Sequence, residues 1–272
     1  MKWNFFAENG KWVRVLNRLS WIMIAFPIAY CLTRVLVVDS FIVPSESMTP
    51  TLNPGDRIWA WKLPYGPRLY RSLDFSDGRP NCFRLPGVGE IEPGDIMVFN
   101  SPQNGEHGSG VWFTINDVCC KRVIGCPGHR IGAVDGHCWN DKVLHPIGNL
   151  DMQEMLRWSY DSIFIWSSHY YVFPEAGNDW NIKNWGPVTV PFRGLEIDTS
   201  AQENSVYRMA VEYETGLPFM QVGKEYVFQH DWFFVLGDNS PSSQDSRFFG
   251  FVPDDFVIGV LHNSRLSFSG EP

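Results

Sequence analysis

The sequence predicts a mainly β domain carried on one N-terminal membrane-spanning helix. An almost uninterrupted apolar stretch occupies residues 19–38, and beyond residue 40 short β-rich runs alternate with turns that contain glycine and proline. The apolar fraction of 44% and the aromatic fraction of 15% are those of a folded protein. We therefore expect a cytoplasmic N-terminus over residues 1–18, a membrane helix over 19–38 and an extracytoplasmic all-β domain over 39–272.

The membrane helix is predicted from its length and from the charges around it. Residues 19–38 supply the roughly twenty apolar residues that a helix needs to cross a bilayer. Pro27 is tolerated in such a helix, and Arg34 lies near its far end, where a long side chain can reach the lipid headgroups. The residues before the stretch carry a positive excess over the single acid Glu8, from Lys2, Lys11, Arg14 and Arg18. By the positive-inside rule, the N-terminus stays in the cytoplasm and the rest of the chain lies outside.

Two other interpretations of this stretch are less consistent with the sequence. A cleaved signal peptide has a shorter apolar core and a small-residue exit, and neither is present here. A buried helix of a soluble domain would not explain the charge asymmetry. We therefore interpret the stretch as a retained anchor.

Two similar turns each precede a predicted strand. In Asn53–Asp56 and Glu92–Asp95 a proline supplies a φ near −65° and the following glycine supplies the positive φ of a type II turn. Alternation and β-rich composition predict six strands, at Arg57–Ala60, Ile96–Phe99, Cys119–Ile124, Tyr226–Phe228, Trp232–Leu236 and Val257–Leu261.

One further helix is predicted at Asp151–Tyr160. It falls within residues 145–225, a stretch rich in tryptophan and polar turns that separates the segments with the strongest candidate site residues. We interpret this stretch as a subdomain inserted into the β domain.

Composition argues against several classes of function. A net charge of −8 and a pI near 5.3 are unfavourable for binding nucleic acid through its phosphates. The six cysteines are too few for a disulfide scaffold and form no CxxC pair, and the seven histidines are scattered, so no metal is expected. One disulfide involving Cys138 or Cys82 remains open. No phosphate-binding glycine motif is present, so no cofactor is expected.

The first candidate catalytic segment is Pro44–Leu52, a few residues beyond the predicted membrane helix. A serine-rich stretch between prolines is ordinary loop composition, but here it would face a substrate lying along the bilayer surface. Ser47 is therefore a candidate nucleophile. Its apolar neighbours are predicted to line shallow substrate pockets: Phe41, Val43, Met48 and Leu52.

The second segment is Cys119–Gly128, which places Lys121 within a run of small apolar residues. Burying an ammonium is costly unless its pKa falls, and a lysine that is neutral near physiological pH can act as a general base. In the alternative interpretation Lys121 and Arg122 alternate on an edge strand and Lys121 points to solvent.

The third segment is Gly237–Pro253, a polar loop that follows a predicted strand and is dense in hydroxyl groups. Asp245 and Arg247 are close enough to brace the loop by an ion pair, and Ser243 could bond to a nearby amine. The alternative is a solvated hairpin loop.

Together the three segments resemble the motifs of bacterial type I signal peptidases, in the same order along the chain. These are membrane-bound Ser-Lys proteases with an all-β catalytic domain. The resemblance rests on PSESMTPTLNPGDRI, EPGDIMVF, KRVIGCPGHRI and GDNSPSSQDSRFFGFVP, and it is weak across residues 145–225.

The resemblance implies a role for each matching residue. Ser47 would attack the scissile carbonyl, Lys121 would take its proton, and Ser45 would contribute to the oxyanion hole. Ser243 would orient the Lys121 amine, and Asp245 with Arg247 would hold the loop. The chain departs from the family pattern at Ser240–Ser242 and at Cys119–Cys120, so the loop tip and the adjoining substrate pocket are not predicted.

The resemblance also implies the substrates and the location. The substrates would be the signal peptides of exported preproteins, cut after small residues at positions −1 and −3. The protein would lie in the cytoplasmic membrane as a single-pass protein with its catalytic domain on the outer side, near the export machinery. A specialised family member with few substrates, or a tethered β domain that binds exported chains without cutting them, remain the alternatives.

Overall fold

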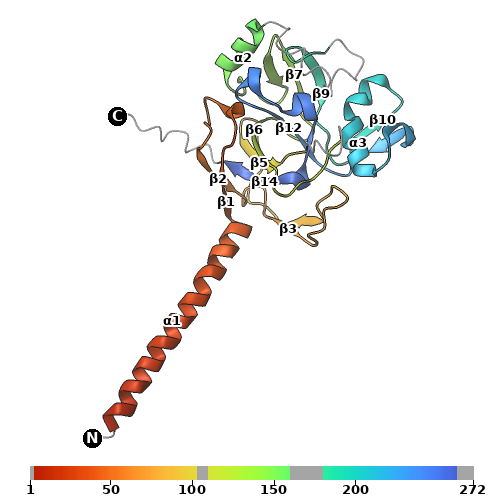
Figure 1. Ribbon diagram of the computed structural model, residues 1–272. Coiled ribbons are helices and arrows are strands. Elements are labelled where there is room, and N and C mark those ends of the chain that lie inside the picture. Colours follow the sequence, from red (N-terminus) through yellow and green to blue (C-terminus); the bar gives the residue numbers. More distant parts are fainter. Residues whose placement is uncertain (1–2, 103–109, 160–179, 262–272) are drawn as a thin grey trace.

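The computed structural model describes residues 3–102, 110–159 and 180–261. Its first element is a long helix, α1 (Trp3–Leu36), which extends away from the rest of the protein (Figure 1). Residues 12–36 of this helix have a mean hydropathy of 1.7 and none of that span is buried. The helix ends two residues before the predicted boundary at Val38, because Val38 already pairs with Trp61 in an antiparallel sheet.

A seven-stranded antiparallel sheet forms the body of the domain, which confirms the mainly β prediction. The strand order is β1-β2-β14-β5-β6-β12-β13, so strands distant in the sequence become neighbours at the centre. The six predicted strands are all present, and each bound lies within one residue of its prediction. The strands of the sheet are β1 (Val38–Ile42), β2 (Arg57–Trp61), β5 (Ile96–Asn100), β6 (Val118–Gly125), β12 (Trp232–Leu236), β13 (Val252–Pro253) and β14 (Val257–Leu261).

The two predicted turns have the expected conformation. Gly55 and Gly94 have φ values of +94° and +102°, which an L side chain rarely adopts. The amide N–H of Asp56 donates to the Asn53 carbonyl at 3.0 Å, and that of Asp95 donates to the Glu92 carbonyl at 3.1 Å. These turns fix where β2 and β5 begin.

Most of the remaining elements lie between β6 and β12. They include a three-stranded sheet of order β8-β7-β9, a two-stranded sheet of β10 and β11, and the helices α2 and α3. Their bounds are β7 (Arg130–Val134), β8 (His137–Asn140), β9 (Trp185–Thr189), β10 (Glu196–Asp198), β11 (Glu225–Val227), α2 (Leu150–Trp158), η4 (Gln202–Tyr207), α3 (Arg208–Thr215) and η5 (Phe219–Gln221). A separate hairpin of β3 (Arg68–Tyr70) and β4 (Cys82–Arg84) follows β2.

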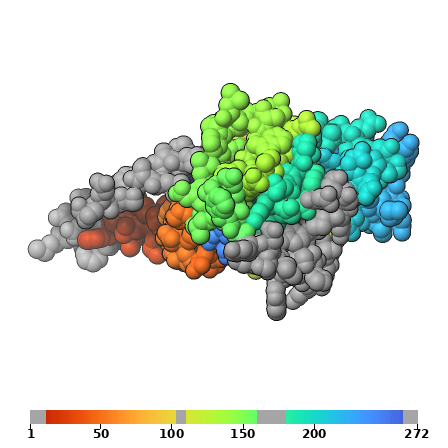
Figure 2. Space-filling model, turned by 90° about the horizontal axis from the view of Figure 1, so that it is seen from above, coloured from red at the N-terminus to blue at the C-terminus, as the bar shows by residue number. Residues whose placement is uncertain are grey.

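The segments between β6 and β12 make up much of the face opposite α1, as the green and cyan surface in Figure 2 shows. They begin at Arg130, upstream of the predicted insertion at 145–225, part of which (160–179) lies outside the described residues. These segments share one hydrophobic core with the main sheet. For example, the rings of Trp185 and Phe234 lie 4.9 Å apart. Because the core is shared, it marks no boundary for a separate subdomain, and the inserted subdomain stays a prediction.

Sequence reasoning located α2 but missed the hairpin that precedes it. The helix predicted at Asp151–Tyr160 is present as Leu150–Trp158, with Tyr160 outside the described residues. The β7–β8 hairpin turns at Asp135-Gly136, both with positive φ, +51° and +83°. An Asp-Gly pair between two apolar runs is a strong hairpin signal that could have predicted this turn.

Candidate active site

Ser47 lies on η1 (Glu46–Met48), a single helical turn in the loop between β1 and β2. Its hydroxyl is 3.3 Å from that of Ser45. Met48, the next residue, is fully buried and fixes the turn to the smaller of the two main hydrophobic cores. The local structure therefore holds the Ser47 side chain at the edge of a packed loop.

Lys121 lies near the middle of β6, a strand bonded to β5 on one side and β12 on the other. Its side chain is buried, only 4% exposed, and Nζ donates a hydrogen bond to Ser243 Oγ at 3.1 Å. The alternative with an edge strand and a solvent-facing lysine is therefore wrong. Burial lowers the pKa of Lys121, and the nearby Asp245 carboxylate opposes this shift in part.

The polar loop after β12 is braced by a buried ion pair. The Arg247 guanidinium donates two hydrogen bonds of 2.8 Å to Asp245 and one of 2.9 Å to the Ser240 carbonyl. Burial alone would raise the pKa of Asp245, but Arg247 holds it below the ordinary value. Arg247 and Asp245 lie at α4 (Ser246–Phe249) and its N-cap, so the ion pair also fixes the start of that short helix.

Gly237 is the residue at which the Ser47 loop and the Ser243 loop meet. A Cβ atom at this position would lie 2.1 Å from Ser243 Oγ and 2.4 Å from the Ser47 carbonyl oxygen, so only glycine fits. Its amide N–H donates to Asp245 at 3.0 Å. Although both side chains are described, no hydrogen bond joins Ser47 Oγ to Lys121 Nζ. The two residues are instead brought into one site through Gly237 and Ser243.

Asn239 fastens the loop that carries Ser47. Its amide N–H donates to the Ser47 carbonyl at 3.0 Å, and its side-chain amide donates to Glu46 O at 3.1 Å and to Thr49 Oγ1 at 3.0 Å. Sequence reasoning did not single out Asn239, although it stands in the quoted Gly-Asp-Asn motif. Its position just after a predicted buried strand could have indicated that Asn239 bonds to a neighbouring loop.

Asp238 connects β6 to the same loop. It accepts two hydrogen bonds from Arg122, from Nε at 2.6 Å and from Nη2 at 2.5 Å, and another from the Thr51 hydroxyl. Since Asp238 is 2% exposed, this pair is well shielded from water. Arg122, which adjoins Lys121, therefore fixes β6 to the loops that contribute Ser47 and Ser243.

The residues predicted to line substrate pockets lie mostly inside the protein. Val43, Met48 and Leu52 are buried in the smaller core, where they support the Ser47 loop. Phe41 packs against that core and also lines a cavity of about 210 Å³ with Val118 and other residues. Their contact with substrate stays a prediction.

The cysteines form no disulfide; all six are free thiols. Cys119 and Cys120, next to Lys121, are partly buried, and burial raises the pKa of Cys120 to about 11. They therefore act as small, largely apolar side chains beside the lysine. The open possibility of a bridge through Cys138 or Cys82 is not realised, because both are free.

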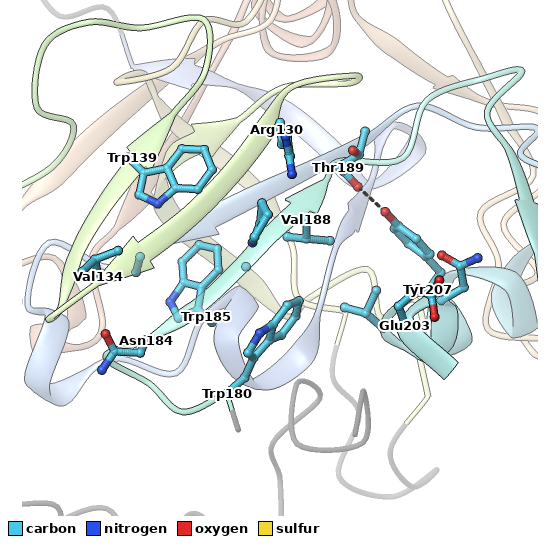
Figure 3. A pocket seen from close by; sticks show the side chains of 15 residues that line it. Arg130, Val134, Trp139, Trp180, Asn184, Trp185, Val188, Thr189, Glu203 and Tyr207 are labelled. Carbon is cyan, nitrogen blue, oxygen red and sulfur yellow. Dashed lines mark hydrogen bonds between the residues drawn. The ribbon is translucent and has the colours of Figure 1, made fainter. Parts of the chain in front are cut away.

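A larger cavity lies away from this site, between β7, β9 and η4 (Figure 3). Its volume is about 900 Å³, and neither Ser47 nor Lys121 lines it. Three tryptophans line it instead, Trp139, Trp180 and Trp185.

Comparison with known proteins identifies the family. The family model described as "Signal peptidase, peptidase S26" matches residues 15–264. A signal peptidase I from Buchnera aphidicola subsp. Baizongia pistaciae (strain Bp) is 28% identical over 239 residues, which cover 84% of this chain and 69% of the relative. The signal peptidase I of Rickettsia felis (strain ATCC VR-1525 / URRWXCal2) is 28% identical over 254 residues, covering 91% and 79%.

Among solved structures, a signal peptidase I from Enterococcus faecalis V583 is similar at 22% identity and a TM-score of 0.31, covering 65% of this chain and 100% of that one. So low a TM-score says nothing about how the site of this chain is arranged. The family match, by contrast, extends from within α1 to beyond β14 and includes every site residue described above. The chain belongs to the signal peptidase family, peptidase S26.

Proposed function

We propose that this protein is a membrane-anchored serine endopeptidase that removes signal peptides from exported preproteins, with Ser47 as nucleophile and neutral Lys121 as general base. Family membership supports signal-peptide removal by a serine peptidase. The observation that carries the residue assignment is the buried Lys121 amine, which is hydrogen-bonded to Ser243. Ser243 in turn packs against Gly237, and Gly237 lies against the Ser47 carbonyl. Cleavage after small residues at −1 and −3 is part of the same proposal.

The first step is acylation of the enzyme. A serine hydroxyl is a weak nucleophile until a base accepts its proton, and the lowered pKa of Lys121 keeps its amine available for this. Ser47 Oγ attacks the scissile carbonyl carbon as its proton passes to Lys121 Nζ. The resulting oxyanion accepts hydrogen bonds from the Ser45 hydroxyl and the Ser47 amide N–H. Losing one such donor typically costs about 2.7–4 kcal/mol of transition-state stabilisation.

Acylation is complete when the Lys121 ammonium donates its proton to the leaving amine and the peptide C–N bond breaks, which leaves the signal peptide as an ester on Ser47. In the second step Lys121, neutral again, takes a proton from water as the water attacks the ester. Collapse of this second intermediate breaks the bond between Ser47 Oγ and the acyl carbon, returns the proton from Lys121 to Ser47 and releases the signal peptide with a free carboxyl group. Ser243 holds the amine in place throughout, and the Asp245–Arg247 pair braces the loop that carries Ser243.

The placement of Ser47 suits a substrate that emerges from the membrane. The chain passes from α1 directly into β1, an edge strand of the main sheet, and then into the Ser47 loop. An extended substrate can add to such an edge by backbone hydrogen bonds. We propose that the N-terminus of α1 is cytoplasmic, that the β domain lies on the outer side, and that the enzyme works near the export machinery. No nucleic-acid partner is proposed.

The test is cleavage of a model preprotein by the purified full chain in lipid vesicles. Ser47→Ala and Lys121→Met should each reduce cleavage by several orders of magnitude. Lys121→Met keeps the apolar part of the side chain, so the fold should be retained. Ser200→Ala and Lys224→Ala, at exposed positions, serve as matched controls and should cleave normally. Cleavage at the wild-type rate by Ser47→Ala or Lys121→Met would exclude the Ser-Lys assignment.

A further inference from the structure

Helix α2 packs on the loop that holds the base. It contacts η6 (Ser240–Ser242), and in Figure 1 it lies beside the blue ribbon of that loop. Ser243, the partner of the Lys121 amine, follows η6 directly. A displacement of η6 therefore moves Ser243 relative to Lys121.

A small hydrophobic cluster joins α2 to α4, the short helix that follows η6 and Ser243. Leu156 of α2 is 1% exposed and packs with Ile182 and Phe248, apart from the two main cores. Phe248 belongs to α4, and the Arg247 guanidinium lies over its ring at 5.7 Å. Since Arg247 also binds Asp245 and the Ser240 carbonyl, the cluster is connected to η6 through Arg247.

The position of α2 is itself well defined. The Asn149 side chain caps its N-terminus by accepting from the Met152 amide at 3.0 Å. The buried Gln153 accepts from the Cys138 amide at 3.2 Å and donates to the Ile147 carbonyl at 2.7 Å. Gln153 and Leu156 are three residues apart, so they share the inward face of the helix. The helix is thus a fixed support rather than a loosely attached segment.

We propose that α2 is a positioning element for the catalytic lysine and that Leu156 is the positioning residue through which it acts, by way of Phe248 and η6. The proposal rests on the proposed function of Lys121 and Ser243. It gives the segment between β6 and β12 a role in catalysis without any contact to substrate. The loop after β12 is braced by the Asp245–Arg247 pair and is contacted by α2, and in this proposal both hold Ser243 at 3.1 Å from the amine.

The test compares Leu156→Ala with Met155→Ala, its neighbour on the exposed face of the same helix, using the full chain in lipid vesicles. The measurements are kcat, KM and the pH dependence of kcat, all taken well below the melting temperature. Each kcat is divided by the fraction of Ser47 that an acylating inhibitor labels, which gives kcat per labelled site. Leu156→Ala should lower kcat per labelled site by about tenfold to a hundredfold and leave KM within about twofold. The acidic limb of its kcat profile should move, because the Lys121 amine no longer keeps its partner. Met155→Ala should match the wild type, and the volume-conserving Leu156→Met should restore most of kcat.

A merely structural role gives a different result. Loss of folded protein lowers the labelled fraction but leaves kcat per labelled site and the acidic limb unchanged, and that outcome overturns the proposal. If Leu156→Ala does not fold, Leu156→Val, which removes less volume, carries the same test. Activity in Ser47→Ala or Lys121→Met would instead overturn the Ser-Lys assignment, so the two failures are distinguishable.

Discussion

At the scale of single residues, the proposed mechanism depends on how burial and charge act on the Lys121 amine. Lys121 is 4% exposed, and the Asp245 carboxylate acts on its pKa more strongly than the Arg247 guanidinium does. Desolvation nevertheless dominates and lowers the pKa of Lys121, while Asp245 alone would raise it. In the proposed mechanism, the base therefore needs no histidine or carboxylate partner.

The pH dependence of the rate follows from this shift. A lysine with a lowered pKa is protonated and inactive at low pH, and it becomes a base as pH rises through its folded-state value, below the ordinary 10.5. We expect kcat/KM to rise with pH along an acidic limb that lies below the pKa of an exposed lysine. The measurement is kcat/KM on a short peptide across mildly acidic to alkaline pH, with Lys224→Ala as the control that keeps the limb. A rate that stays flat over this range would argue against lysine as the base.

At the scale of elements, local sequence patterns predicted most of the turns, strands and helices that were named in advance. The contacts between distant segments could not be predicted from such patterns. The type II turns, the strands and α2 were predictable because proline, glycine and β-rich runs act locally. Ser47, Lys121 and Ser243 were identified by resemblance to a family, not by spacing. The contact of Gly237 with Ser47 and Ser243, and that of α2 with η6, depend on how distant segments pack. No local pattern encodes such contacts.

The element η7 (Asp254–Phe256) shows how buried polar groups join three parts of the fold. Arg68 and Arg84 of the β3–β4 hairpin donate to the carbonyls of Asp255 and Asp254, and Tyr213 of α3 donates to the Asp255 carboxylate at 2.9 Å. The other Asp255 oxygen, Oδ1, is buried with no hydrogen-bond partner. Burial, and then the charge of Asp254, raise the pKa of Asp255 to about 6.

This shift makes stability depend on pH. Because the folded-state pKa is above the unfolded value of about 3.9, the stabilising contribution of protonated Asp255 is fully present below that value and is lost as pH rises through about 6. The loss amounts to about 3 kcal/mol. We expect Asp255→Asn to remove this part of the pH dependence, measured as the free energy of unfolding by denaturant between pH 4 and about 7.5. Asp151→Asn, at an exposed position of α2, controls for the loss of one carboxylate. Parallel curves for the wild type and Asp255→Asn would refute the expectation.

At the scale of the whole molecule, the anchor takes no part in the packing of the β domain's cores. No residue of α1 belongs to a hydrophobic core among the described residues, and none of its apolar span is buried. Polar contacts are present at the junction: the Arg34–Asp39 ion pair, and a hydrogen bond from Lys62 to the Arg34 carbonyl at 2.6 Å. Exposed ion pairs contribute little to stability, about 0–1 kcal/mol.

A variant that begins at Thr33 keeps these junction contacts and should therefore retain the melting temperature of the β domain. Its kcat/KM on a short water-soluble peptide should stay within about threefold of the full chain, because α1 contributes nothing to the site. On a preprotein inserted in lipid vesicles it should fall by about a hundredfold, since the anchor no longer confines enzyme and substrate to one surface. Equal losses on both substrates would mean that α1 shapes the active site. Equal activity on both would mean that membrane confinement has no part in substrate capture.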